Sequence, residues 1–320
     1  YHFTDSTYLD SNNGMSVSEE GILTLPTVSA HTSDVNTQIG TITVPVVTTN
    51  YQNFEFTIKV YISARIPPNA SGVTVSASDI TYGQMLNESK LTATGTMKHP
   101  GTGEEVKGTF AWTNPEAKPG AAGDYTASWT FTPAAGYEEY APATGTVTIK
   151  VNKATPTFTA PTAQENLTYT GQEQALITAG MTDHGTMLYS LTENGTYSQD
   201  IPTGTDAGAY TVWYRVIGDE NHNNTAPASV AVSIGKKPLT ITGVTVAPKP
   251  YDGTTNADIS SVTFDNVTLN RGTDYTVTAS FDDASVGNGK NITATVTLME
   301  QAAKNYALEQ SNFTTTGNIT

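Results

Sequence analysis

The chain has 320 residues, of which 37% are hydrophobic, 14% are charged and none is cysteine. Its 30 acidic and 15 basic residues give a formal charge of -15, and such a field repels phosphate backbones and anionic membranes. We therefore expect no nucleic-acid binding. No apolar run approaches the ~18 residues of a membrane span, so we also expect no membrane insertion. Without cysteine, the chain also has no thiol nucleophile and no thiolate metal site.

Residues 1–66 predict a short or incomplete β module. The stretch "GILTLPTV" (21–28) indicates one strand, and 40–63 indicates two more, joined by a Thr-Asn-Tyr turn. "ARIPPNASG" (64–72) is interpreted as a linker, because proline fixes φ and limits bending. No basic-then-apolar leader precedes these strands, so we interpret the chain as a piece of a longer protein whose targeting signals lie outside it.

Residues 67–153 and 154–236 predict two β modules of one kind. Apolar and polar residues alternate in "YTASWTF" (125–131), "TVTIKV" (146–151), "YTVWYRV" (210–216) and "SVAVSI" (229–234), which is typical of strands with one buried face. "AGDYTASWTF" matches "AGAYTVWYRV", and Tyr125 lies 85 residues before Tyr210. Trp112, Trp129 and Trp213 fall in such strands and are expected in the cores.

Residues 237–320 predict a further module, with alternating strands at "YTVTASF" (275–281) and "ITATVTL" (292–298). Its "PYDG" is in phase with "ITYG" (80–83) and "LTYTG" (167–171). The stretch that begins "KKPLTITGVTVAPKPYDGTTNADISSVTF" resembles the YDG repeat of bacterial surface proteins. The two modules before it resemble the related MBG and bacterial Ig-like repeats.

The resemblance implies tandem Ig-like antiparallel β-sandwiches, strung along secreted or wall-attached proteins that are often from Gram-positive gut bacteria. We therefore predict an all-β fold of four modules in an elongated array, with bounds 1–66, 67–153, 154–236 and 237–320. The family has no catalytic motif to carry over. An extracellular or cell-wall location follows from the resemblance alone.

Candidate catalytic residues are few. The five histidines, His2, His31, His99, His184 and His222, show neither the i, i+4 spacing of helical ligands nor the i, i+2 spacing of strand ligands. The acidic pairs Glu104–Glu105, Glu138–Glu139 and Asp282–Asp283 are adjacent in sequence, so on strands they would point to opposite faces. We expect neither an enzyme nor a cofactor.

Calcium is the inorganic ligand with the best candidates. Asp219 and Glu220 in "GDENHNN" and Asp282 and Asp283 in "DDASVGN" gather oxygen donors in loops, as calcium prefers. Neither loop has EF-hand spacing, and ordinary turns use the same residues. The plain turn is the default interpretation.

Three tyrosines are candidates for contact with a ligand: Tyr137 and Tyr140 in "GYEEYAP", and Tyr306 in "NYALE". Exposed aromatic rings could stack on sugars. The favoured interpretation is that these rings pack at a corner of the sandwich.

The Tyr-Asp-Gly motif is interpreted as a structural turn. Tyr82, Tyr169 and Tyr251 share a phase, but only the last is followed by an acid, Asp252. We expect the tyrosines to pack into the modules, Asp252 to cap the turn, and Gly83, Gly171 and Gly253 to use positive φ.

The sequence thus favours a non-enzymatic, monomeric stalk or spacer segment of an adhesin-like cell-surface protein. The alternative is a module that binds carbohydrate or a host protein through loops of one or more sandwiches.

Overall fold

The computed structural model describes residues 2–4, 16–17, 23–24, 37–46, 49–62 and 64–320. These residues are almost entirely β, as predicted. Contacts divide the chain into two compact units, Tyr1–Ala154 and Thr155–Thr320. No helix among the described residues is long and apolar enough to cross a membrane.

The first unit begins with a small sheet of order β1-β4-β5 and a separate β2-β3 pair. The predicted hairpin is confirmed as β4 and β5, whereas most of 21–28 lies outside the described residues. The strands are β1 (His2–Thr4), β2 (Ser16–Val17), β3 (Leu23–Thr24), β4 (Thr37–Val46) and β5 (Phe54–Ile62).

The rest of the first unit is built on a four-stranded sheet of order β11-β12-β13-β7, beside the pairs β6-β8 and β9-β10. Its elements are β6 (Thr74–Ala77), β7 (Ile80–Thr81), the 3-10 helix η1 (Leu86–Glu88), β8 (Leu91–Thr94), β9 (Met97–Lys98), β10 (Glu105–Val106), β11 (Gly108–Trp112), β12 (Gly123–Pro133) and β13 (Ala143–Asn152).

The stretch interpreted as a linker, 64–72, is part of this module. The Ile66 N–H donates to the carbonyl of Glu139, and the Asn69 N–H donates to the carbonyl of Lys98. Backbone pairing therefore fixes these residues, where the prolines alone had suggested only a stiff connection.

The second unit contains a three-stranded sheet of order β19-β21-β22, flanked by the pairs β14-β18, β15-β17 and β16-β20. These strands are β14 (Phe158–Thr159), β15 (Thr162–Ala163), β16 (Gln174–Ala175), β17 (Ile177–Thr178), β18 (Met181–Thr182), β19 (Thr186–Ser190), β20 (Thr203–Gly204), β21 (Gly208–Ile217) and β22 (Ala228–Ile234).

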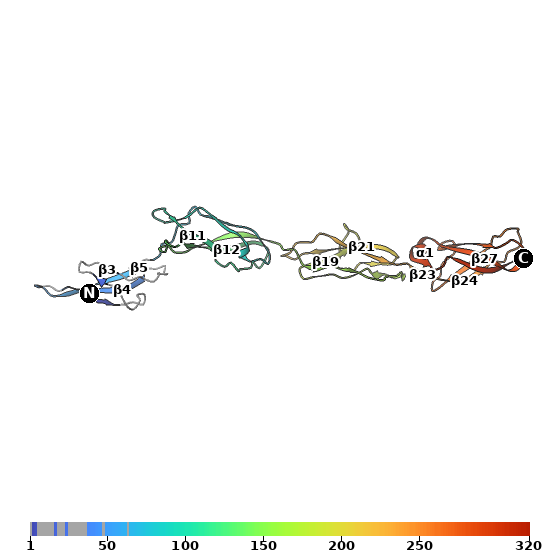
Figure 1. Cartoon of the computed structure of the whole chain (residues 1–320), viewed down its shortest axis with the longest axis horizontal. Coiled ribbons are helices and arrows are strands. Elements are labelled where there is room, and N and C mark those ends of the chain that lie inside the picture. Colours follow the sequence, from blue (N-terminus) through green and yellow to red (C-terminus); the bar gives the residue numbers. More distant parts are fainter. Residues whose placement is uncertain (1, 5–15, 18–22, 25–36, 47–48, 63) are drawn as a thin grey trace. The chain divides into compact units, whose positions relative to one another are not determined.

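The same unit ends in a module with sheets β26-β27-β29 and β24-β25 and a parallel pair β23-β28. Figure 1 shows its long strands running side by side. The elements are β23 (Lys237–Leu239), β24 (Ile241–Val246), β25 (Ile259–Phe264), β26 (Tyr275–Phe281), β27 (Gly287–Leu298), α1 (Glu300–Asn305), β28 (Tyr306–Leu308) and β29 (Asn312–Ile319).

Among the described residues, apolar cores form within 66–320, because alternate residues of facing strands point inward. In 237–320, the core lies between β25 and the sheet β26-β27-β29 and includes Ile259, Phe281 and Ile292. A second core lies within 163–234 and includes Leu176, Val212 and Val216. Two further clusters, around Ile149 and Phe131, fill 66–151.

Candidate functional site

The three motif tyrosines occupy equivalent backbone positions. The N–H groups of Tyr82, Tyr169 and Tyr251 donate to the carbonyls of Asn152, Gly235 and Thr320, at 2.8, 2.9 and 2.8 Å. In each case the acceptor lies at or just after the end of a long strand. The three tyrosines that align in the sequence therefore also make the same backbone hydrogen bond in the structure.

The side chains at these positions differ. Tyr82 and Tyr169 are partly buried against the cores of their own modules, whereas Tyr251 is 61% exposed. The expectation that all three tyrosines pack inward is wrong for Tyr251. The glycines behave alike: Gly83, Gly171 and Gly253 have φ of 92°, 80° and 75°, a region that favours glycine.

Asp252 is held as a turn cap. Its Oδ1 accepts the Thr254 N–H at 2.8 Å, and both carboxylate oxygens accept Lys249 Nζ at 2.8 Å. The hydrogen bond from Lys249 is the main reason that the pKa of Asp252 is lowered to about 2. A carboxylate with these partners orders the turn, so the prediction that Asp252 caps the turn is confirmed.

Residues 206–207 and 301–306 form a contact that joins the last two modules; we call it the module contact. Asp206 lies just before β21, and its carboxylate accepts hydrogen bonds from three side chains of α1: Gln301 at 2.7 Å, Lys304 at 2.7 Å and Asn305 at 3.1 Å. The hydrogen bond from Lys304 is the largest cause of the lowered pKa of Asp206, about 2.

Asn305 is the buried centre of the module contact, with 1% of its surface exposed. Its Oδ1 accepts the Ala207 N–H at 2.8 Å while its Nδ2 donates to Asp206. Beside it, Lys236 Nζ donates to the Ala303 carbonyl at 2.6 Å. Sequence reasoning missed this contact because α1 is too short to show helical periodicity.

The tyrosines proposed for ligand contact are packed. Tyr306 meets Tyr169 edge to face across the module contact, with ring centroids 5.3 Å apart. Tyr140 is 7% exposed and belongs to a core cluster, with Tyr137 packed against that cluster. Burial of Tyr140 contradicts the hypothesis that it contacts a ligand and agrees with packing, the favoured interpretation of these tyrosines.

The calcium candidates have other partners. The carboxylate of Asp283 accepts from Lys290 Nζ and from Ser285, which lowers its pKa strongly. Asp282 accepts from the Asp283 N–H at 3.1 Å. Glu220 is exposed. The ammonium of Lys290 occupies the place that a cation would take at Asp283, so the second loop is a turn stabilised by side chains.

Asp219, the remaining calcium candidate, faces two histidines. His222 Nδ1 lies 2.7 Å from Asp219 Oδ1, and His184 Nδ1 lies 3.9 Å from Asp219 Oδ2. The two imidazoles stack with centroids 4.0 Å apart. The hydrogen bond with His222 is the largest cause of the lowered pKa of Asp219. Sequence reasoning missed this histidine pair because 37 residues separate its members.

The other histidines are ordinary where their side chains are described. His99 Nδ1 accepts the N–H groups of Gly101 and Thr102 in a turn. His31 lies outside the described residues.

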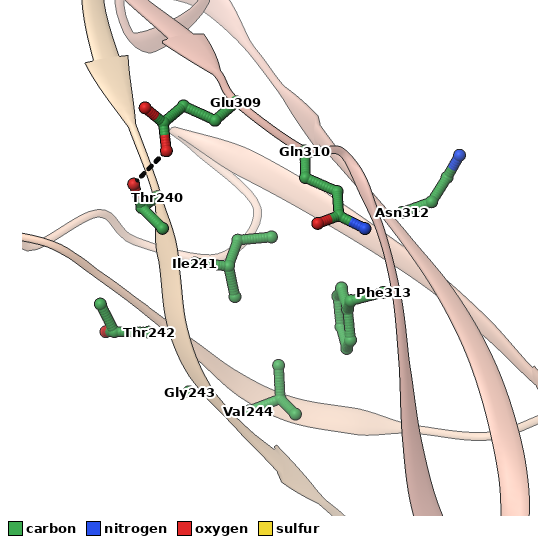
Figure 2. A pocket seen from close by; sticks show the side chains of 9 residues that line it. All are labelled: Thr240, Ile241, Thr242, Gly243, Val244, Glu309, Gln310, Asn312 and Phe313. Atoms are coloured by element: carbon green, nitrogen blue, oxygen red, sulfur yellow. Dashed lines mark hydrogen bonds between the residues drawn. The ribbon is translucent and has the colours of Figure 1, made fainter.

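A pocket of about 330 Å³ opens on the C-terminal module, between β24 and the start of β29. Figure 2 shows the apolar side chains of Ile241, Val244 and Phe313 converging on it, beneath Glu309 and Gln310. Thr240 donates a 2.6 Å hydrogen bond to the Glu309 carboxylate at its rim. The pocket thus combines an apolar floor with a polar rim.

Comparison with known proteins gives one family match. Residues 235–315 match the YDG domain, and no curated protein matches the chain. The match covers β23 to β28, the first residues of β29 and the motif Tyr251-Asp252-Gly253, and it leaves the preceding modules unassigned. Residues 235–315, within the C-terminal part of this chain, are therefore a YDG domain.

Proposed function

We propose that the chain is a non-enzymatic spacer: a series of tandem Ig-like β modules in an extracellular, cell-surface protein. The observation that carries this proposal is the module contact. A spacer must keep its modules in a defined relation, and Asp206 with its three donors does so between consecutive modules.

Separate cores support the same proposal. The stretches 66–151, 163–234 and 239–319 bury separate apolar clusters, so a module can be added without changing the core of its neighbour. The three carboxylates whose pKa is lowered most, Asp206, Asp252 and Asp283, stabilise turns or the module contact. A structural role for these residues agrees with the spacer proposal.

An elongated spacer predicts a large radius of gyration in solution. A compact protein of this length would have a radius of gyration of about 20 Å. Small-angle X-ray scattering of the whole chain should give a value well above that, with the scattering profile of a monomer at all concentrations. A radius near the compact value would contradict the spacer.

A second candidate function, binding of a glycan or a host protein, is favoured by the pocket at Phe313. If the chain is a binding module, a glycan and mucin array should detect binding that Phe313→Ala weakens at least about tenfold, because the ring forms the pocket floor. Tyr251→Ala, which removes an exposed ring outside the pocket, is the control. An intact chain that binds nothing on the array would remove this candidate.

A further inference from the structure

The histidine pair and Asp219 lie where two loops meet at one end of the sheet β19-β21-β22. His184 lies in the turn between β18 and β19, and Asp219 and His222 lie in the loop between β21 and β22. The strands β19 and β21 pair with Thr186 opposite Ile217, so this register brings the two loops together.

Two glycines permit the close approach of these loops. A Cβ at Gly185, which has φ of 112°, would lie 2.1 Å from the Ile217 carbonyl oxygen. A Cβ at Gly218 would lie 2.4 Å from the His222 carbonyl oxygen. Larger residues would separate the loops, so the backbone itself positions the three side chains.

The cluster is ordered on one side and open on the other. His222 is 7% exposed, and the Asn221 N–H donates to Asp219 Oδ1 at 2.8 Å. The side chains of His184 and Asp219 are 41% and 40% exposed. Solvent can therefore reach the carboxylate and the outer imidazole.

The donor set selects a class of cation. One ligand atom from each residue lies within 4.8 Å of the others, and tetrahedral zinc needs donors about 3 to 3.5 Å apart. The two rings are stacked with an interplanar angle of 15°, so the half-exposed His184 ring must turn out of this stack to direct a nitrogen at an ion beside Asp219 and His222. Two imidazoles and one carboxylate suit zinc and its neighbours, whereas calcium takes oxygen ligands.

We propose that His184, Asp219 and His222 form a binding site for a divalent transition-metal ion of the zinc class, with water or an outside ligand completing the coordination. This site does not depend on the spacer proposal. It differs from the sequence-based hypotheses, which considered Asp219 as a candidate calcium ligand and expected no metal site at the histidines.

Isothermal titration of the untagged, metal-stripped chain with zinc chloride tests the site, with calcium chloride as the second titrant. We expect one zinc ion per chain and no calcium binding at these residues. His184→Ala should weaken zinc binding by at least about tenfold, since disturbing even the surroundings of a metal ligand costs ten- to hundredfold. Glu220→Gln, an exposed neighbour outside the cluster, should bind zinc like the parent chain.

Thermal melts separate loss of a ligand from loss of the fold. Without zinc, His184→Ala should melt like the parent chain, because its side chain is half exposed; with zinc, only the parent and Glu220→Gln should gain stability. Asp219→Asn supplies a second ligand variant and should also lose zinc affinity. Absence of zinc binding, equal binding by all variants, or calcium binding in place of zinc would overturn the proposal.

Discussion

Replacing Ile292 by alanine should destabilise the YDG domain by about 3 to 4 kcal/mol, near the middle of the range of about 2 to 5 kcal/mol for truncating a buried aliphatic side chain to alanine. Ile292 is 0% exposed in β27, between Phe281 of β26 and Thr315 of β29. The site has little room to collapse: a Cβ on Gly317 would lie 2.8 Å from Ile292 Cδ1, so the backbone of β29 already touches this side chain.

Calorimetry of the whole chain measures the effect and tests the separate cores at the same time. The transition that contains residues 237–320 should fall by roughly 15 °C or more, while the transition of Tyr1–Ala154, a separate unit, should stay in place. Thr293→Ala, at the exposed next position, should change stability by no more than about 0.5 kcal/mol. A common shift of every transition would contradict the spacer, because it would mean one shared core.

The strands could be predicted from the sequence because a half-buried strand shows its period directly. The alternating stretches at 125–131, 210–216 and 275–281 all lie within β12, β21 and β26. The position of a residue in the alternating pattern predicted its burial better than its residue type did. In β21, Val212 and Tyr214 are buried, and Trp213 between them points to the other face and is only partly covered. The expectation that Trp213 is core weighed its size above its position.

The module contact and the histidine cluster could not be predicted, because both depend on how distant segments meet. α1 has six residues, fewer than two turns, so no apolar stripe identifies it. The histidine cluster had a faint signal: a histidine two residues before β19, and Asp219 two residues after β21, the strand that pairs with it. The sequence does not show that Thr186 of β19 pairs with Ile217 of β21, and this pairing is what brings His184 close to Asp219.

The rings of the motif tyrosines have different surroundings. Tyr169 packs against its own core and contacts Tyr306 of the following module, whereas Tyr251 is 61% exposed. The three tyrosine N–H groups make the same backbone hydrogen bond, so the equivalence holds for the backbone and does not extend to the burial of the rings. The alignment of the repeats alone could not show that Tyr169 is partly buried and Tyr251 is exposed.

Asn305→Ala should open the module contact. The substitution removes the acceptor of the buried Ala207 N–H and one of the three donors to Asp206, and leaving a buried backbone donor without a partner costs about 1 to 3 kcal/mol. Hydrogen exchange at the Ala207 amide should accelerate by roughly ten- to hundredfold. Asn312→Ala, which removes an exposed hydrogen bond to Thr295 in the same domain, should leave that amide unchanged.

Acid should weaken the same contact through Asp206. Its pKa is lowered from 3.8 to about 2 by its donors, so its stabilising effect is fully present above about pH 4 and is lost as the pH falls through about 2. The measured quantity is the protection factor at Ala207, which is the exchange rate of the unprotected amide divided by the observed rate at the same pH. Asp206→Asn should remove the pH dependence of this protection factor. Asn305→Asp keeps an acceptor for Ala207 but adds a carboxylate beside Asp206, so its protection factor should be low at pH 7 and rise on mild acidification. A high, pH-independent protection factor in Asn305→Ala and Asn305→Asp would show that other contacts hold the modules together, and the spacer proposal would lose the observation that carries it.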